Sequence, residues 1–396
     1  MRLLWCSDAP WSPTGYGVQA RSLLPRLAWL PQFGGKKNIA IFAFFGLQGA
    51  MMEIGGFRMY PHGGGEYGQD LIGHHARHFG ADVVVTLVDA WTQPRTAELV
   101  APAKWYPWIP IDSDPVPAKT LAALEGAARP LVYSKFGERQ LLDSGVECRY
   151  IPHGIEPGVF RREKDAERRA LRAPANRAAL GGDGCEHLTV MVAANVGTPA
   201  GADRKAFPLQ MRGWARFAAD KPGARLYIHA DPLPHYGGPD LRALARQLGI
   251  ADRVRFPGSY EYFLGYPAEQ VAAIYQAADV YLGASMAEGF GLPIIEAQAC
   301  GVPVVVTDYA SMPELVEWGA VVPPLDLYWA AGLETWWAWP DWHAIGEGLQ
   351  EVYEEIREQR DLDEWADCVS ENIHRRYGWD TVVEQYWQPL VREWAA

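Results

Sequence analysis

Two glutamates eight positions apart bracket the stretch of the sequence that is best suited to chemistry. Glu288 and Glu296 lie on either side of a Gly-Phe-Gly-Leu-Pro segment. This segment follows a predicted strand at Val280–Leu282 and enters a predicted helix that has Pro293 in its first turn and Gly301 as its C-cap. Such a loop directs backbone N–H groups and the positive helix end toward a ligand, most often a phosphate. Carboxylates beside it can accept hydrogen bonds from ligand hydroxyl groups, although two solvated glutamates remain the alternative interpretation.

A basic pair follows another predicted strand, Leu188–Ala193. Arg204 and Lys205 end the loop 195–205. Fixed cations at such a position can stabilise negative charge on a ligand. The alternative is a solvated basic pair beside Asp203.

A shorter glycine motif lies near the N-terminus. Gly15 and Gly17, within Ser12–Gly17, follow a predicted strand at Arg2–Ser7 and precede a helical pattern that runs through Leu30. A phosphate-binding loop and a simple tight turn both fit this motif.

The residues around the glutamate pair resemble the retaining GT-B glycosyltransferases, especially glycosyltransferase family 4. Tyr275–Leu282 is similar to the family's strand before the pair, and Gly301–Thr307 to the strand after it. Ile151–Ile155, with Phe160, resembles the family's interdomain segment. The resemblance is dense between residues 151 and 322 and weaker before them.

The resemblance implies an α/β protein of GT-B fold. Two Rossmann-like domains with parallel sheets would face a central cleft, and a C-terminal helix would cross back to the first domain. We expect an acceptor-side domain at residues 1–160, with helix 379–396, and a nucleotide-sugar domain at 161–378. The domain junction is predicted at the start of the Ala- and Arg-rich segment 160–184.

The resemblance also implies roles for individual residues. Glu296 would bind the ribose hydroxyls of a nucleotide-diphosphate sugar, Glu288 the transferred sugar, and the loop amides the sugar and diphosphate. The expected donor-binding residues are Gly15, Gly17, Arg204, Lys205, Glu288, Gly289, Phe290, Gly291, Leu292 and Glu296.

The sequence departs from the family where a histidine often follows the strand equivalent to Trp105–Ile111. Here Asp112-Ser113-Asp114 stands instead, and Asp89 ends the neighbouring predicted strand. Either Asp89 or Asp112 could orient a hydroxyl, or be only a loop cap. The expected catalytic residues are Arg204, Lys205, Glu288, Asp112 and Asp89. Because the two cations would neutralise the diphosphate, we expect no metal and no cofactor besides the donor substrate.

Short apolar runs alternate with helical patterns along the whole chain, which predicts two tandem parallel sheets. The remaining predicted strands are 38–44, 57–60, 82–88, 131–133, 149–151, 225–229, 254–256, 302–307 and 320–322. Helices are predicted at 344–360, 364–377 and 379–394. His62, His74, His75 and His78 are expected at surface helix positions, and the Trp-rich stretch 328–342 either packs on the C-terminal helices or stacks on a sugar or partner.

Composition restricts the class of protein. The 396 residues are 49% apolar and 21% charged, which excludes a disordered chain. The net charge of −12 disfavours non-specific nucleic-acid binding. Five scattered cysteines without C-x-x-C, and no long apolar run, predict a cytoplasmic protein without a transmembrane segment, in the host cytoplasm if it is phage-encoded.

The sequence therefore predicts transfer of a sugar from a nucleotide-diphosphate donor to an acceptor hydroxyl, with retention of configuration. The alternatives are a phage-type transferase acting on a modified DNA base, a GT-B epimerase and a non-catalytic sugar-binding module. A glycan, a lipid, a small molecule and a modified nucleic acid all remain possible acceptors, and the oligomeric state is open. The base of the donor should contact the loop 258–262, whose residue types do not select one base.

Overall fold

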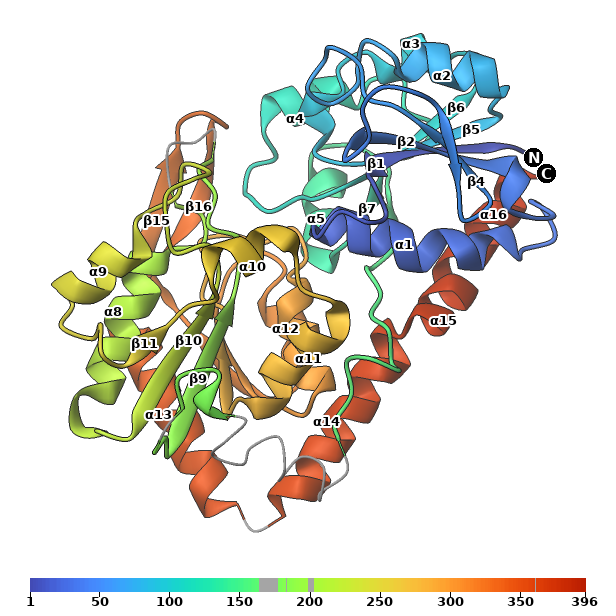
Figure 1. Cartoon of the computed structure of the whole chain (residues 1–396). Helices are drawn as coiled ribbons and strands as arrows, with labels where there is room; N and C mark the ends of the chain where they lie inside the picture. The colour runs from blue at the N-terminus through green and yellow to red at the C-terminus, as the bar shows by residue number, and fades with distance from the viewer. Residues whose placement is uncertain (164–176, 183, 199–202, 360) are drawn as a thin grey trace. The chain divides into compact units, whose positions relative to one another are not determined.

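The computed structural model divides into two compact units (Figure 1). It describes residues 1–163, 177–182, 184–198, 203–359 and 361–396. Unit 1 consists of Met1–Gly154 and Tyr377–Ala396, and unit 2 of Ile155–Arg376. The chain leaves unit 1 at 154/155 rather than at the expected 160/161, and returns at 376/377 rather than 378/379. Most of the Ala-rich segment 160–184 that was expected at this junction lies outside the described residues.

Unit 1 is built on an eight-stranded sheet with the order β3-β4-β2-β1-β5-β6-β7-β8. Its strands are β1 (Leu3–Asp8), β2 (Ile39–Phe45), β3 (Met52–Ile54), β4 (Phe57–Tyr60), β5 (Val83–Leu87), β6 (Lys104–Ile109), β7 (Leu131–Val132) and β8 (Arg149–Tyr150). Only the β3–β4 pair is antiparallel among the strands of this sheet in the described residues. Strand β5 is buried along its whole length, as continuous apolar strands in parallel sheets are.

The helices of unit 1 connect these strands, and the C-terminal segment joins them. They are α1 (Gly15–Ala28), α2 (Ile72–Phe79), α3 (Thr96–Val100), α4 (Ala118–Ala123), α5 (Lys135–Asp143), α15 (Trp379–Val382) and α16 (Gln388–Trp394), with a π-helix at Val383–Trp387 and short 3₁₀ helices at Lys36–Asn38 and Ala90–Thr92. The predicted return of the C-terminal helix to the first domain is confirmed, although a π-helical turn interrupts it.

Aromatic packing holds the C-terminal segment in unit 1. The buried Trp387 ring lies 5.9 Å from that of Trp5 on β1 and 5.0 Å from that of Trp108 on β6. Trp379 covers Gly154, where a Cβ would come within 2.5 Å of the indole. The segment thus supplies part of the core of unit 1.

Unit 2 is built on a six-stranded parallel sheet with the order β11-β10-β9-β12-β13-β14. Its strands are β9 (His187–Val192), β10 (Ala224–His229), β11 (Val254–Arg255), β12 (Val280–Leu282), β13 (Val304–Thr307) and β14 (Gly319–Val322). Its helices are α8 (Phe207–Phe217), α9 (Leu241–Gln247), α10 (Ser259–Leu264), α11 (Ala268–Ala277), α12 (Leu292–Ala299), α13 (Trp342–Glu358) and α14 (Leu362–Tyr377), whose last residue belongs to unit 1, with 3₁₀ helices at Ala218–Asp220 and Pro313–Leu315. Across the described part of the chain, we find no helix long and apolar enough to cross a membrane.

The Trp-rich stretch forms an antiparallel hairpin, β15 (Pro324–Ala330) and β16 (Thr335–Pro340). Trp337 is buried in a cluster with Ala206, Met286, Ala287 and Ala330. Trp337 therefore packs on the loop before Glu288. Packing on the C-terminal helices and stacking on a sugar or partner stay predictions for the rest of the stretch. Neither strand of this hairpin was predicted from the sequence.

We expect Trp387→Ala to destabilise unit 1 by about 3–5 kcal/mol, because it removes a large buried ring from contact with two others. Trp29, which is 86% exposed on the same unit, is the matched control, and Trp29→Ala should change stability by less than about 0.5 kcal/mol. Urea unfolding followed by far-UV circular dichroism measures both. Equal midpoints for the two variants would contradict a core role of the C-terminal segment.

Candidate active site

The loops that follow β9 and β12 meet at the point where the strand order of unit 2 reverses. These two strands are neighbours in the sheet, with the other strands added outward on either side. Ligands of parallel α/β sheets bind at such a switch point, outside the carboxyl ends of the strands. Arg204 and Lys205 lie in the loop after β9, and Glu288 in the loop after β12. Residues 199–202 of the first loop lie outside the described residues.

The carboxylate of Glu288 joins both cations. Lys205 Nζ donates to Oε1 at 2.6 Å and Arg204 Nη1 to Oε2 at 3.1 Å, while Ser285 Oγ donates to Oε1 at 2.7 Å. Burial alone would raise the pKa of Glu288, but the charges of Lys205 and Arg204, with the hydrogen bonds from Lys205 and Ser285, lower it to about 2. The Glu288 carboxylate is therefore ionised at neutral pH, and Asp203 is a second carboxyl group within electrostatic reach of both cations.

Buried hydrogen bonds fix the two loops to each other. Gln210, on α8, donates from Nε2 to the Lys205 carbonyl at 2.5 Å and accepts from the Ala284 backbone N–H at 2.9 Å. The Met286 N–H donates to the Arg204 carbonyl at 2.9 Å. Ser311 Oγ lies 2.7 Å from the carbonyl oxygens of both Glu288 and Phe290. Sequence reasoning missed Gln210 and Ser311, because a single polar residue within an apolar pattern gives no motif.

The predicted glycine loop leads directly into α12. Gly291 is the N-cap with φ +104°, a conformation that L-residues rarely adopt, and Pro293 lies in the first turn. A small pocket beside this helix end is lined by Lys205, Gln210, Tyr281, Ser285, Glu288, Gly291, Pro293 and Ile294, among others. The backbone of Gly289, Phe290, Gly291 and Leu292 thus lies between Glu288 and the start of the helix. The positive end of α12 adds to the field of the two cations.

Glu296 lies one turn further along α12 in a different environment. Tyr275, on α11, donates its hydroxyl to Glu296 Oε2 at 3.0 Å. Burial raises the pKa of Glu296 to about 7, and the Tyr275 hydrogen bond opposes this rise only in part. Burial, and then the charges of Glu288 and Glu296, raise the pKa of Tyr281, so this ring lies within electrostatic reach of both glutamates. The two carboxylates therefore have widely separated pKa values.

In unit 1 the glycine motif begins a helix. Helix α1 starts at Gly15, and Thr14 caps it by accepting from the Gly17 N–H at 3.1 Å. A Cβ on Gly17 would come within 2.5 Å of the Ser12 carbonyl, so this position requires glycine. The Thr14 hydroxyl donates to Asp8 Oδ2 at 2.5 Å. Sequence reasoning missed Asp8, which is the last residue of β1.

Three aspartates follow adjacent strands of unit 1. Asp8 ends β1, Asp89 lies just after β5 and Asp112 lies beyond β6, and these strands are neighbours. Burial raises the pKa of Asp8. Burial and nearby charges, Asp89 and Asp8 among them, raise the pKa of Tyr67. The carboxyl edge of this sheet, where β1 is the switch point, thus gathers Asp8 and Asp89 around a tyrosine, with half-buried Asp112 on the next strand.

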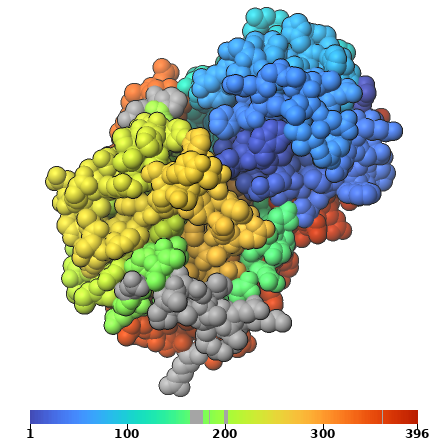
Figure 2. Space-filling model, viewed as in Figure 1, coloured from blue at the N-terminus to red at the C-terminus, as the bar shows by residue number. Residues whose placement is uncertain are grey.

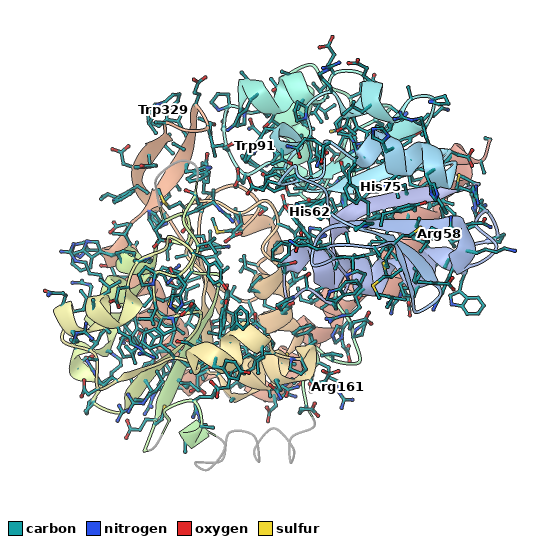
Figure 3. The ribbon with its side chains drawn as sticks, turned by 45° about the horizontal axis from the view of Figure 1, so that its top comes forward. Arg58, His62, His75, Trp91, Arg161 and Trp329 are labelled. Atoms are coloured by element: carbon teal, nitrogen blue, oxygen red, sulfur yellow. The ribbon has the colours of Figure 1, made fainter. Side chains whose placement is uncertain are left out.

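The histidines contribute packing on unit 1. On α2, His74 and His78 are exposed and His75 is half-buried, stacked on Tyr60 at 4.5 Å between ring centroids; His62 precedes this helix (Figure 3). Burial lowers the pKa of His75. Within the described ranges, no group of three or more His, Cys, Asp or Glu side chains could hold a metal ion.

A second, larger pocket in unit 2 has a volume of about 350 Å³. It is lined by Asp231, His235, Tyr236, Ser259, Tyr260, Tyr262 and Phe263. The loop 258–262, expected to contact a base, forms α10, which lies on the surface of unit 2 (Figure 2). His235 Nδ1 lies 2.6 Å from Asp231 Oδ2, so one polar pair accompanies the aromatic walls.

The two parallel-sheet units define the class of fold. Sucrose-phosphate synthase from Thermosynechococcus elongatus superposes with a TM-score of 0.71 over 100% of both chains at 20% identity, and Anabaena HepE in complex with UDP-glucose with a TM-score of 0.69 over 99% of this chain and 100% of that one at 14% identity. These structures are GT-B glycosyltransferases, and the chain has the GT-B fold.

Sequence comparison identifies the family of the second unit's core. Residues 191–332 match the model of the family "Glycosyl transferases group 1". The D-inositol 3-phosphate glycosyltransferase of Segniliparus rotundus is 32% identical over 167 residues, 42% of this chain and 33% of that protein. The chain spans about a third of the length of the curated relatives it matches.

We expect Glu296 to titrate near pH 7 in the folded protein, and its pKa to rise in Tyr275→Phe, because that variant loses the hydrogen bond that favours the carboxylate. Carbon-13 NMR of the glutamate carboxyl groups measures the midpoint, with Glu296→Gln assigning the signal. Tyr260→Phe, at an exposed position on α10, is the matched control and should leave it unchanged. A Glu296 midpoint below about 5.5 would contradict the effect of burial.

Proposed function

We propose that the chain is a retaining glycosyltransferase that moves a sugar from a nucleotide-diphosphate donor to an acceptor hydroxyl. The observation that carries this proposal is the joining of Arg204 and Lys205 by Glu288 at the switch point of unit 2. Two fixed cations beside a helix N-terminus are suited to a diphosphate. The match of residues 191–332 to the group 1 glycosyltransferase family supports the same assignment.

Arg204 and Lys205 act on the leaving group. As the bond between the sugar and the diphosphate breaks, negative charge grows on the phosphate oxygen, and the two cations stabilise that charge in place. The same oxygen takes the proton of the attacking acceptor hydroxyl on the same face of the sugar, so no protein nucleophile is needed. Glu288 orients the cations and contacts a hydroxyl of the transferred sugar, because its carboxylate retains capacity for a further hydrogen bond.

Glu296 binds the ribose hydroxyls. Its carboxylate accepts two hydrogen bonds from a vicinal diol only when it is ionised. With a pKa near 7 before ligand binding, it must lose its proton for the donor to bind tightly. Donor affinity therefore rises as the pH increases through 7.

Unit 1 provides the acceptor side. Asp112 and Asp89 orient the acceptor hydroxyl or the transferred sugar, and Asp8 joins them because it lies at the end of the central strand β1. Gly15 and Gly17 allow the chain to approach a ligand closely at the first turn of α1. HepE, one of the structural neighbours, was solved with UDP-glucose, which supports a nucleotide sugar as donor.

The base of the donor occupies the aromatic pocket at α10. Tyr260 and Phe263 offer exposed rings on which a base can stack, and the volume of about 350 Å³ admits one. Thermal shifts with UDP, GDP, ADP and dTDP identify the base, since a ligand that binds only the folded chain raises its melting temperature.

Release of nucleoside diphosphate from sugar nucleotides tests the proposed function. We expect Arg204→Ala and Lys205→Ala each to lower kcat about a hundredfold or more, with a smaller loss of diphosphate affinity. Arg242→Ala, an exposed cation on α9 of the same unit, is the control and should keep full activity. If no nucleoside diphosphate is released from sugar conjugates of UDP, GDP, ADP or dTDP, the assignment is wrong. If Arg204→Ala and Lys205→Ala both keep near-normal turnover, the diphosphate binds elsewhere.

We expect catalysis to survive exhaustive EDTA treatment, because Arg204 and Lys205 supply the positive charge that a metal would otherwise bring. Asp112→Asn should lower kcat with little change in nucleoside diphosphate affinity, because Asp112 acts on the acceptor side. Activity assays and calorimetry measure these effects. Loss of activity that Mg²⁺ or Mn²⁺ restores would instead make Asp112 and Asp114 metal ligands.

A further inference from the structure

The β15–β16 hairpin exposes a row of apolar side chains. In its register Trp329 pairs with Trp336 and Leu327 with Ala338, and residues paired across antiparallel strands share a face. On this face Leu327, Trp329 and Trp336 are 48%, 44% and 40% exposed. Leu325, at the irregularity in the register, is 62% exposed. Exposed apolar groups gathered in this way mark a binding surface.

The opposite face fixes the hairpin to the candidate active site. Trp337 is 1% exposed and packs on Met286 and Ala287, directly before Glu288. The Ala338 N–H donates to the Met286 carbonyl at 3.1 Å, and Tyr309 Oη donates to the Trp336 carbonyl at 2.8 Å. The exposed face therefore holds a set position relative to Glu288, within the same unit.

The exposed rings are ordered by their own contacts. Trp329 and Trp336 lie edge to face, with centroids 4.9 Å apart and planes 62° apart (Trp329 is labelled in Figure 3). Tyr328 and Trp339, on the other face, stack at 5.5 Å. Rigid aromatic side chains bind a partner with little loss of conformational freedom.

The charges of the hairpin residues indicate which class of partner could bind this face. Residues 324–340 include two acidic residues, Asp326 and Glu334, and no lysine or arginine. An anionic bilayer, which basic segments attract, would be repelled, and the net charge of −12 adds to that repulsion. A neutral glycan matches this composition, because its C–H faces stack on indole rings and need no charged partner.

We propose that Leu327, Trp329 and Trp336 bind the sugar rings of an oligosaccharide acceptor. The proposal rests on the proposed glycosyl transfer and names the class of its acceptor. Because the hairpin is anchored to the loop that carries Glu288, a glycan chain held on it would stay near the transferred sugar while its end reacts.

Affinity electrophoresis through gels that contain dextran, mannan or arabinogalactan tests this binding without any turnover. We expect at least one polysaccharide to retard the wild-type chain, and Trp329→Ala/Trp336→Ala to raise its dissociation constant about tenfold or more. Trp365→Ala, at a 42% exposed tryptophan on α14 of the same unit, is the matched control and should be retarded like the wild type. Circular dichroism checks that the variants are folded.

Three results would overturn the proposal. One is the absence of retardation by all three polysaccharides, and another is equal retardation of the double variant. The third is that the double variant loses binding to phosphatidylcholine vesicles or loses a concentration-dependent dimer, since a bilayer or a second copy would then be the occupant. None of these measurements uses a sugar nucleotide. A failure of glycan binding would therefore not contradict the proposed donor chemistry of unit 2. Likewise, a failure of the nucleoside diphosphate release assay would not affect the outcome of the glycan-binding test.

Discussion

The structure of the candidate site depends on a largely buried carboxylate that holds two cations. Taking three charges out of water is costly unless they are paired and hydrogen-bonded. Glu288 meets this condition through Lys205, Arg204 and Ser285, and its low pKa keeps it ionised throughout the physiological range. The two cations, which Glu288 holds in place and which also interact with Asp203, can stabilise the negative charge of an arriving anion. The electrostatics that stabilise this loop pair thus also favour the proposed ligand.

The same pair of loops supports everything else near the site. Gln210 and Ser311 hold the backbone of both loops near Glu288 with hydrogen bonds between uncharged groups, which do not titrate. The hairpin packs on Met286 and Ala287 of the same loop. A substitution that loosened this loop would disturb the cations and the exposed aromatic face together.

The sequence was informative where periodicity or a motif was strong. Strands β4 and β12 have the predicted bounds, and Arg204, Lys205 and Glu288, which spacing and resemblance singled out, lie in contact. The β15–β16 hairpin was missed because aromatic residues on both faces, such as Trp336 and Trp337, hide the alternation that marks a strand. The short edge strand β3 was also missed, since three partly exposed residues carry little signal. The different environments of Glu288 and Glu296 depend on Lys205 and Tyr275, whose proximity only the fold determines.

The two sheet edges carry opposite electrostatics. At the switch point of unit 2, two cations and a helix N-terminus surround one carboxylate, a setting that favours an anion. At the switch point of unit 1, Asp8 and Asp89 act on the Tyr67 hydroxyl, and burial raises the pKa values of Asp8 and Tyr67. Carboxyl and phenol groups exchange hydrogen bonds with hydroxyl groups. The two edges therefore differ in the chemistry that they offer, since unit 2 presents cations and unit 1 presents carboxyl and phenol groups.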